Sequence, residues 1–190
     1  MKPAEIQKRI EELVSGDVFL HGFSKVTIDE VARKTGISKR TLYQIFPTKD
    51  DLLFPLLDRK IASIQQEMEE IRTSSSNIST RLKKSFYLVG KEMEVVTQTF
   101  VLDIAKHYPK PWKRIEEFRN QLVATWEQDI QLGVEQRIFK EVHPTLFIIA
   151  FLHAARATME REFLVNQPFS DEQAINQLVE IFFDGLRSSR

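Results

Sequence analysis

The 190-residue chain is 42% hydrophobic and 28% charged, a composition typical of one or two globular domains and too apolar for a disordered protein. Its 27 basic and 27 acidic side chains balance, so the molecule as a whole has no field that attracts nucleic acid. Because cysteine is absent, disulfides, thiolate metal sites and cysteine nucleophiles are excluded, and a reducing compartment is favoured.

Two further exclusions concern membranes and secretion. The most apolar stretch, residues 146–155, contains His153 and is about half as long as a membrane-spanning helix. The first residues are charged throughout and lack the apolar centre of a secretory signal. We therefore expect a cytoplasmic protein with no membrane partner.

The spacing of apolar residues predicts an all-α protein, because three- and four-residue steps recur and strand-like alternation is missing. A first helix is expected over about 3–20, a short second one after Thr27, a third over Ser38–Phe46 and a fourth after Thr48. A polar loop is expected at 72–80, followed by helices at about 81–107, 112–138, 145–166 and 171–187.

Local signals mark the ends of these helices. Thr27 and Glu30 have the spacing of a reciprocal capping box, and Gly36 is suited to the left-handed turn that closes a helix. Ser38, Thr48 and Ser170 are expected N-caps. Inside the fourth helix, Pro55 removes one backbone donor and should bend the helix.

Charge is distributed unevenly along the chain. Residues 1–49 hold nine basic and six acidic side chains, and the segment Val31–Lys49 holds five cations and no acid. Such asymmetry is a hint of a nucleic-acid-binding end, although a run of cations is more often a solvated face.

The second and third helices, joined by Lys34–Ile37, have the layout of a helix-turn-helix whose second helix enters the major groove of DNA. Arg40 and Gln44 lie four residues apart and suit the edges of guanine and adenine, while Thr41 suits a thymine methyl group. Phosphate contacts are expected from a further set: Thr27, Ser38, Lys39, Tyr43 and Lys49. Taken singly, these residues are equally explained as caps, packed side chains or solvated lysines.

Together, residues 6–57 resemble the N-terminal DNA-binding domain of TetR-family transcriptional regulators. The matching segments follow in the family's order and spacing: His21–Phe23, Thr27–Ala32, Thr35–Lys39, Thr41–Tyr43, Phe46 and Lys49–Leu52. The sequence departs from the family pattern at Arg40, Ile45, Gly16–Asp17 and Pro55, which leaves the base preference and the angle between the domains open.

The resemblance implies two domains and a mode of action. Residues 1–50 would form the helix-turn-helix domain, and residues 51–190 a helical effector-binding and dimerisation domain. The expected function is a repressor that binds a near-palindromic operator as a homodimer through Ser38–Phe46 and is released by a small molecule. Coupling would run through the fourth helix, where Pro55 would act as a bend.

Two apolar helices near the C-terminus predict the dimer interface. The helix at 145–157 is apolar nearly all round and the last helix carries an apolar stripe, so in a small chain a partner is needed to cover them. The interface is expected at Leu146, Ile149, Ile175, Leu178, Val179, Phe182, Phe183 and Leu186. The alternative is the core of a monomeric bundle.

Aromatic side chains in the middle helices suggest a largely apolar effector pocket. Its candidate residues are Phe86, Met93, Phe100, Trp112, Phe118, Trp126 and Phe151, with His153 and Arg156 as polar anchors. The alternative is that the aromatics are core residues and that His153 is a hydrogen-bonded interior histidine.

Other functional classes have less support. The four histidines form no HExxH pair and no phosphate-cradling glycine motif is present, so we predict no enzyme, no metal and no cofactor. A scaffold or small-molecule carrier without DNA binding is the remaining alternative, and Arg40, Gln44 and Lys49 argue against it.

Overall fold

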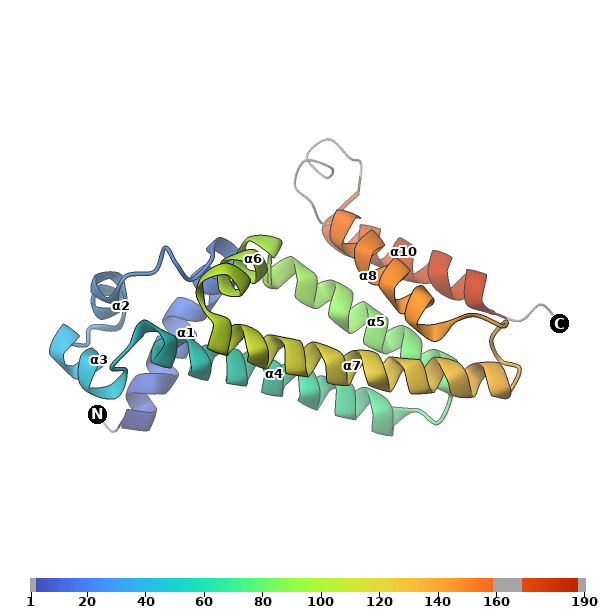
Figure 1. Ribbon diagram of the computed structural model, residues 1–190, viewed down its shortest axis with the longest axis horizontal. Helices are drawn as coiled ribbons and strands as arrows, with labels where there is room; N and C mark the ends of the chain where they lie inside the picture. The colour runs from blue at the N-terminus through green and yellow to red at the C-terminus, as the bar shows by residue number, and fades with distance from the viewer. Residues whose placement is uncertain (1–2, 159–168, 188–190) are drawn as a thin grey trace. The chain divides into compact units, whose positions relative to one another are not determined.

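The computed structural model describes residues 3–158 and 169–187, which are predominantly helical (Figure 1). Its helices are α1 (Pro3–His21), α2 (Ile28–Thr35), α3 (Lys39–Ile45), α4 (Lys49–Ser74), α5 (Ile78–Val95), α6 (Gln98–His107), α7 (Pro109–Glu135), α8 (Pro144–Thr158) and α10 (Asp171–Leu186). Over these ranges there is no strand, only an isolated antiparallel bridge between Phe139 and Arg187. The all-α prediction is confirmed. Among the helices so described, none has both the length and the hydropathy needed to cross a bilayer.

The helices form two compact units. The first contains residues up to Ile64 together with Val95–Phe118, and the second contains Gln65–Glu94 and the residues from Arg119 onward. Each unit has its own hydrophobic core. The first unit is therefore discontinuous in sequence, because it includes α6 and the start of α7 as well as α1–α3 and α4 up to Ile64.

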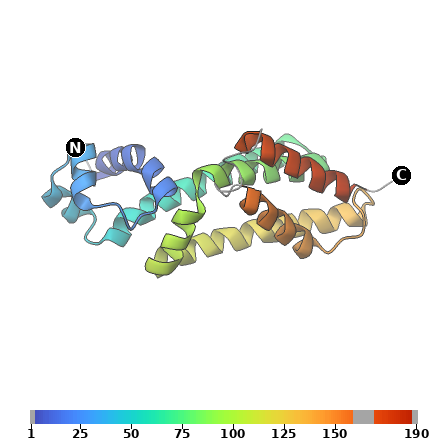
Figure 2. The same ribbon diagram turned by 90° about the horizontal axis from the view of Figure 1, so that it is seen from above.

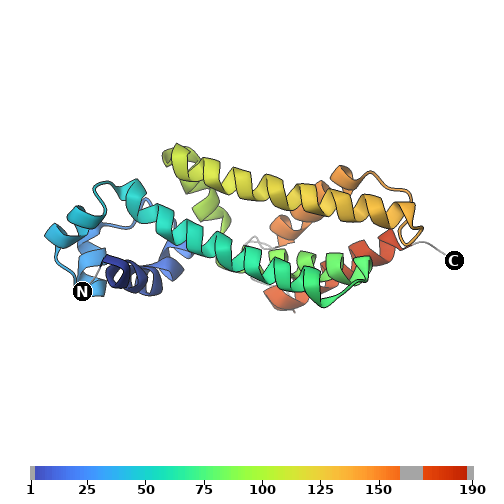
Figure 3. The same cartoon turned by 90° about the horizontal axis from the view of Figure 1, so that it is seen from below.

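In the first unit, α1 packs against α2 and α6, and α2 packs against α3; Figure 3 shows the two short helices beside α1. The predicted apolar face of α1 is buried, with Ile10, Val14 and Val18 in the core. Gly16 does not interrupt this helix, and a Cβ added there would meet no atom within 4 Å. Because its apolar face packs on other helices, α1 tolerates a residue of low helix propensity on its open side.

In the second unit, α8 lies beside α10, as Figures 1 and 2 both show. Helix α5 approaches α10 closely, because a Cβ on Gly90 would lie 2.4 Å from Ile175 Cγ2. On the same pair of helices, the Tyr87 hydroxyl donates to Glu180 at 2.5 Å. Burial, together with the hydrogen bond and charge of Glu180, raises the pKa of Tyr87 to about 12.

Three helix boundaries differ from the predictions. The polar loop predicted at 72–80 is shorter, because α4 continues to Ser74 and α5 begins at Ile78. The helix predicted over 81–107 is two helices, with Thr97 as the N-cap of the second. Helix α7 begins at Pro109, a favourable first position since it needs no N–H donor.

Helix α4 remains one helix through Pro55, whose ring leaves the Asp51 carbonyl without its usual intrahelical donor. Its start is capped reciprocally: the Asp51 N–H donates to Thr48 Oγ1 at 3.2 Å, and the Thr48 N–H donates to Asp51 Oδ2 at 2.9 Å. Ser170 forms a similar box with Gln173 at the start of α10. The predicted caps at Thr48 and Ser170 are confirmed.

Candidate nucleic-acid interface

The turn between α2 and α3 is held by local features. Gly36 ends α2 in the left-handed region, with φ of 69°, where an L-residue would cost roughly 1–2 kcal/mol. At the start of α3, Ser38 Oγ accepts from the Thr41 N–H at 3.1 Å. The turn and both end residues are as predicted.

The cap of α2 is only half of the predicted box. Thr27 Oγ1 accepts from the Glu30 N–H at 3.2 Å. The Glu30 carboxylate, however, lies 3.4 Å from Lys34 Nζ, four residues along the same helix. The Glu30 side chain therefore pairs with Lys34, one turn along α2, instead of completing the predicted capping box.

Helix α3 has one anchored face and one outward face. Leu42 is buried in the first core, with Phe46 just beyond the helix, and Ile45 packs against the same core. On the other side, Arg40 and Gln44 are exposed and Tyr43 is 55% exposed. The side chains predicted to read bases therefore point to solvent, while the helix that carries them is fixed by packing.

Two of the cations near α3, Lys34 and Lys39, have acidic partners from nearby segments. Lys39 Nζ lies 2.6 Å from Asp29 Oδ1, at the start of α2, and Lys34 pairs with Asp17 of α1. The hydrogen bond that Lys34 donates to Asp17, aided by Glu30, holds the pKa of Lys34 above its usual value despite some loss of solvation. The acid-free run Val31–Lys49 is thus partly neutralised in three dimensions by carboxylates outside it.

Lys49 is attached to the protein rather than free in solvent. Its ammonium donates to the Ser24 carbonyl at 3.0 Å and lies 4.9 Å from the centre of the Phe23 ring and 6.0 Å from that of Tyr108. This side chain therefore ties the start of α4 to the segment between α1 and α2.

The same segment is held by a residue that the sequence did not single out, Asp103 of α6. Asp103 Oδ2 accepts from the Ser24 N–H at 2.7 Å, and Oδ1 accepts from the Ser24 hydroxyl. Burial acts to raise the pKa of this carboxyl, but the hydrogen bonds from Ser24 and Phe23 and the charge of His107 hold it below its usual value. Gly22, at φ 90°, leaves room for the carboxylate, since a Cβ there would lie 3.2 Å from Oδ2.

Helix α6 also closes the end of α1. The Thr97 hydroxyl is within hydrogen-bonding distance of the Phe19 carbonyl at 3.1 Å and the Leu20 carbonyl at 3.0 Å, and the Thr97 N–H also donates to Phe19 at 3.1 Å. These carbonyls belong to the last turn of α1, where intrahelical donors are missing. A pairing across 78 residues had no local signal that a sequence pattern could reveal.

The predicted effector residues are divided between the two units. Phe100 is buried in the first core, Trp112 packs against that core, and Phe118 belongs to the same unit. The others lie in the second unit: Phe86, Trp126 and Phe151 are buried in its core, Met93 packs against it, His153 is exposed and Arg156 is partly exposed. The candidate pocket residues thus belong to two separate cores, and His153 is exposed rather than interior.

In the second unit, the aromatic candidates pack on one another. The Phe86 ring lies 4.3 Å from that of Trp126, 4.4 Å from that of Phe151 and 5.5 Å from that of Phe183. Trp126 Nε1 donates to Ser85 Oγ at 3.0 Å, so its one polar group is satisfied. An open groove of about 440 Å³ in this unit is lined by other residues, including Glu127, Leu132 and Pro144.

The predicted dimer residues also separate into two groups. The structure buries Ile175, Val179, Phe183 and Leu186 in the core of a single chain, where they cannot face a partner. Their place in the predicted interface is corrected accordingly. By contrast, Leu146 is 65% and Ile149 49% exposed, and Leu178 and Phe182 are partly exposed. Ile181, which is not among the predicted interface residues, is 67% exposed.

No group of three or more potential metal ligands comes together within the described parts of the chain. The arrangement around α3 is that of a binding surface. It offers hydrogen-bond donors and acceptors on a short, well-anchored helix, with cations beside it.

Comparison with known proteins supports this description. A family model described as bacterial regulatory proteins, tetR family, matches residues 18–56, from the end of α1 to the start of α4. The chain is 22% identical over 166 residues to YvaF of Bacillus subtilis (strain 168), named as an uncharacterized HTH-type transcriptional regulator, with 87% of each chain covered.

Two solved structures show a similar fold at low identity. A putative transcriptional regulator from Saccharomonospora viridis, in complex with choline, matches with a TM-score of 0.83 and 16% identity, covering 98% of this chain and 100% of that one. AibR, in complex with isovaleryl coenzyme A and operator DNA, matches with a TM-score of 0.74 and 17% identity, covering 94% of this chain and 98% of that one.

Proposed function

Because this chain belongs to the TetR family of DNA-binding transcriptional regulators, we propose that it is a repressor of the cytoplasm that binds a near-palindromic operator as a dimer and leaves it when a small molecule binds. The observation that carries the proposal is the outward face of α3, where Arg40, Tyr43 and Gln44 are exposed while Leu42 holds the helix to the core. Regulation of this kind needs no catalytic step.

We assign base reading to the middle of α3. Arg40 and Gln44 are one turn apart on the exposed face, so both reach the same groove edge. Thr41 is half-buried and its hydroxyl shares a hydrogen bond with Ser38 Oγ at 2.8 Å, which leaves its methyl group for a thymine. Arginine pairs with guanine acceptors and glutamine with adenine, so this pair supplies sequence preference.

Phosphate contacts are proposed for residues around the edge of this face: Thr27, Ser38, Lys39, Tyr43 and Lys49. Lys39 can reach a phosphate by exchanging its exposed partner Asp29. Lys49 has a structural task as well, since it holds the Ser24 carbonyl. We therefore expect Lys49→Ala to weaken binding to all DNA sequences alike and also to loosen the segment that precedes α2.

A second copy of the chain is proposed to cover the outer faces of α8 and α10. Four of the predicted interface residues are kept: Leu146, Ile149, Leu178 and Phe182. We add Ile181, which lies between Leu178 and Phe182 on α10 and is 67% exposed. Exposed aliphatic side chains on two adjacent helices favour an interface between identical surfaces. A dimer would place two reading helices on two half-sites.

Leu146→Glu tests the dimer, with Leu102→Glu as the matched control. Both leucines are exposed, at 65% and 60%, but Leu102 lies on α6 in the other unit. Sedimentation equilibrium should find a dimer for the wild type and for Leu102→Glu, and a monomer for Leu146→Glu. A monomeric wild type, or a dimer that survives Leu146→Glu, would contradict the proposal.

A largely apolar effector is proposed to bind in the second unit. The bound small molecules named for the Saccharomonospora viridis regulator and for AibR support a ligand in this fold. Because Phe86, Trp126 and Phe151 are buried against one another, an apolar molecule reaches them only in a conformation where this cluster opens. We propose that the response reaches the DNA-binding helices through α4, with Pro55 as the point of bending.

Operator binding is the direct test. Sites selected from a random duplex library are measured at several salt concentrations against unrelated DNA. Arg40→Ala and Gln44→Ala should each reduce discrimination by about 1–3 kcal/mol at defined base pairs. Gln65→Ala, an exposed glutamine on α4, is the control and should leave discrimination unchanged. Equal, sequence-independent losses from the α3 variants would refute the assignment of base readers.

A further inference from the structure

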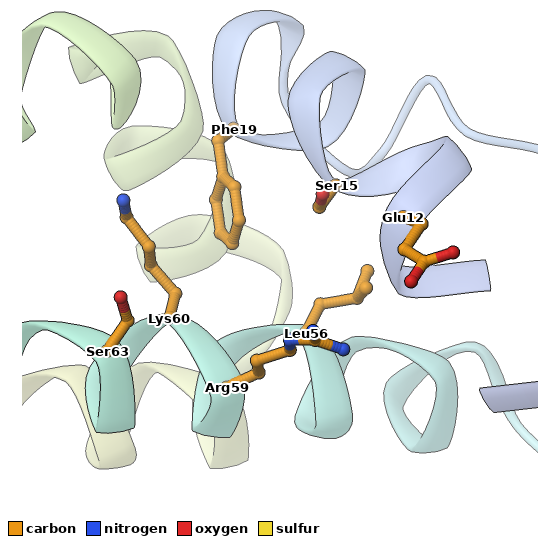
Figure 4. A pocket seen from close by; sticks show the side chains of 7 residues that line it. All are labelled: Glu12, Ser15, Phe19, Leu56, Arg59, Lys60 and Ser63. Carbon is orange, nitrogen blue, oxygen red and sulfur yellow. The ribbon is translucent and has the colours of Figure 1, made fainter. Parts of the chain in front are cut away.

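A cleft of about 250 Å³ opens within the first unit between α1 and α4 (Figure 4). Seven residues line it: Glu12, Ser15, Phe19, Leu56, Arg59, Lys60 and Ser63. At about 30 Å³ per molecule of liquid water, the cleft has room for about eight waters. It shares no residue with the outward face of α3 or with the aromatic core of the second unit.

The cleft lies between one face of α1 and one face of α4, and its polar lining residues are exposed or partly exposed. Glu12, Ser15 and Phe19 follow one another at steps of three and four on α1. The lining residues of α4, from Leu56 to Ser63, have the same helical spacing. Faces of this kind between neighbouring helices normally carry apolar side chains that close the gap. Here the short Ser15 and Ser63 side chains leave the gap open.

The lining combines an apolar floor with charged walls. Phe19 is 5% and Leu56 2% exposed, so the floor is formed by core residues. The back of the Phe19 ring is fixed by an edge contact with Phe100, at 5.1 Å between ring centres. The charged lining residues are two cations, Arg59 and Lys60, and one acid, Glu12.

The polar groups are gathered at two places in the cleft. Figure 4 shows the Lys60 ammonium and the Ser63 hydroxyl both to the left of the Phe19 ring, while Arg59 extends along α4 in the direction of Glu12. An ammonium beside a hydroxyl supplies donors for a carboxylate or a phosphate. An aromatic ring beside them supplies a surface for the apolar part of the same molecule.

We propose that this cleft is a binding site for a small organic anion, in which Lys60 and Ser63 hold the acidic group and Phe19 contacts an apolar body. It is a second small-molecule site, in addition to the effector site proposed for the second unit. The inference concerns binding to the protein alone, so it stands or falls independently of operator binding.

The test is a titration of the full chain with benzoate and with phenyl phosphate, followed by two-dimensional amide NMR. Saturable shifts are expected at Ser15, Phe19, Lys60 and Ser63 at concentrations up to about 10 mM. The tighter of the two probes identifies the acidic group. Benzamide, which is neutral and nearly the same shape as benzoate, should bind at least about tenfold more weakly. Absence of saturable binding by both anions, equal binding of benzamide, or shifts confined to other residues would overturn the proposal.

Variants provide the second half of the test. Lys60→Gln should weaken binding of the better anion at least about tenfold, because a charge-assisted hydrogen bond is lost. Lys84→Gln, an exposed lysine of α5, is the matched control and should bind like the wild type. Ser15→Leu should fill the cleft and abolish binding, with circular dichroism used to verify the fold of each variant. Unchanged binding in both Lys60→Gln and Ser15→Leu would place the anion elsewhere and refute the site.

Discussion

The two units of this protein differ in how well the positions of their predicted functional residues agree with the structure. In the first, the turn around Gly36 and the caps Thr27 and Ser38 are local, and most of the residues predicted to contact DNA, including Arg40, Tyr43 and Gln44, are exposed. In the second, residues chosen as pocket or interface, such as Phe86 and Val179, lie in the core.

The difference shows the limit of helical periodicity. A three- and four-residue step tells which side of a helix is apolar, but not whether the same chain or a partner covers it. On α10, Val179 and Ile181 are two residues apart, and one is fully buried while the other is 67% exposed. The function of the first unit could therefore be predicted from short segments, whereas that of the second depends on packing.

The largest expected effect tests whether the aromatic residues of the second unit are core. Phe86→Ala should lower the free energy of unfolding by about 3–5 kcal/mol, because it leaves a cavity among tightly packed rings. Denaturant unfolding measures the change, with the half-buried Phe54→Ala as a milder control. A stable Phe86→Ala variant would instead favour a preformed pocket at this position.

Two glycines sharpen the description of the first unit. Gly36→Ala should destabilise it by roughly 1–2 kcal/mol and weaken DNA binding, because φ of 69° disfavours an L-residue. Gly16→Ala, in the middle of α1 with no atom within 4 Å of the new Cβ, should stabilise by about 0.5–1 kcal/mol. Thermal unfolding of both variants provides the measurement. If both variants were stabilised, or both were destabilised, the predicted difference between the turn at Gly36 and the middle of α1 would be wrong.

Asp103 gives a pH-dependent test of the link between α6 and the turn before α2. Its pKa is lower in the folded protein than when unfolded, so its contribution is complete above the unfolded pKa and is lost as the pH falls through the folded pKa. Asp103→Asn should therefore lower stability by about 1 kcal/mol at neutral pH, with the difference from the wild type shrinking in acid. Unfolding curves of the wild type and of Asp103→Asn between pH 3 and 7 measure this change in stability. A stability difference between the two that does not depend on pH would contradict an ionised Asp103 contact.

The smallest expected effect concerns the acids beside α3. Asp29→Asn removes the exposed partner of Lys39, a pair that should be worth about 0.2–1 kcal/mol. Affinity for unrelated DNA should therefore rise slightly, and more at low salt than at high salt. Fluorescence anisotropy with a random duplex measures it. Asp184→Asn, on α10, is the control, and an equal rise for both variants would indicate only the change in net charge.

The sequence could predict those features of the structure that depend on residues close together in the chain. The left-handed Gly36 and the caps Thr48 and Ser170 act within four residues, so their patterns are visible in the chain. Thr97 and Asp103 act on residues 77 to 79 positions away, and neither stands in a recognisable motif. Likewise, Gly133 is required by Phe139, whose ring would lie 2.2 Å from an added Cβ, and only the folded turn reveals that contact.

The discontinuity of the first unit has a consequence for how the protein is made. Phe100, Ile104 and Tyr108 complete a core that begins at Ile6, so this core cannot close while the ribosome is still translating the intervening residues. At about 5–20 residues per second, the chain needs about 3–10 seconds to extend from Ile64 to Phe118. During that interval the nascent Phe19 and Phe23 lack their aromatic partners Phe100 and Tyr108, so these two rings cannot yet take their places in the core.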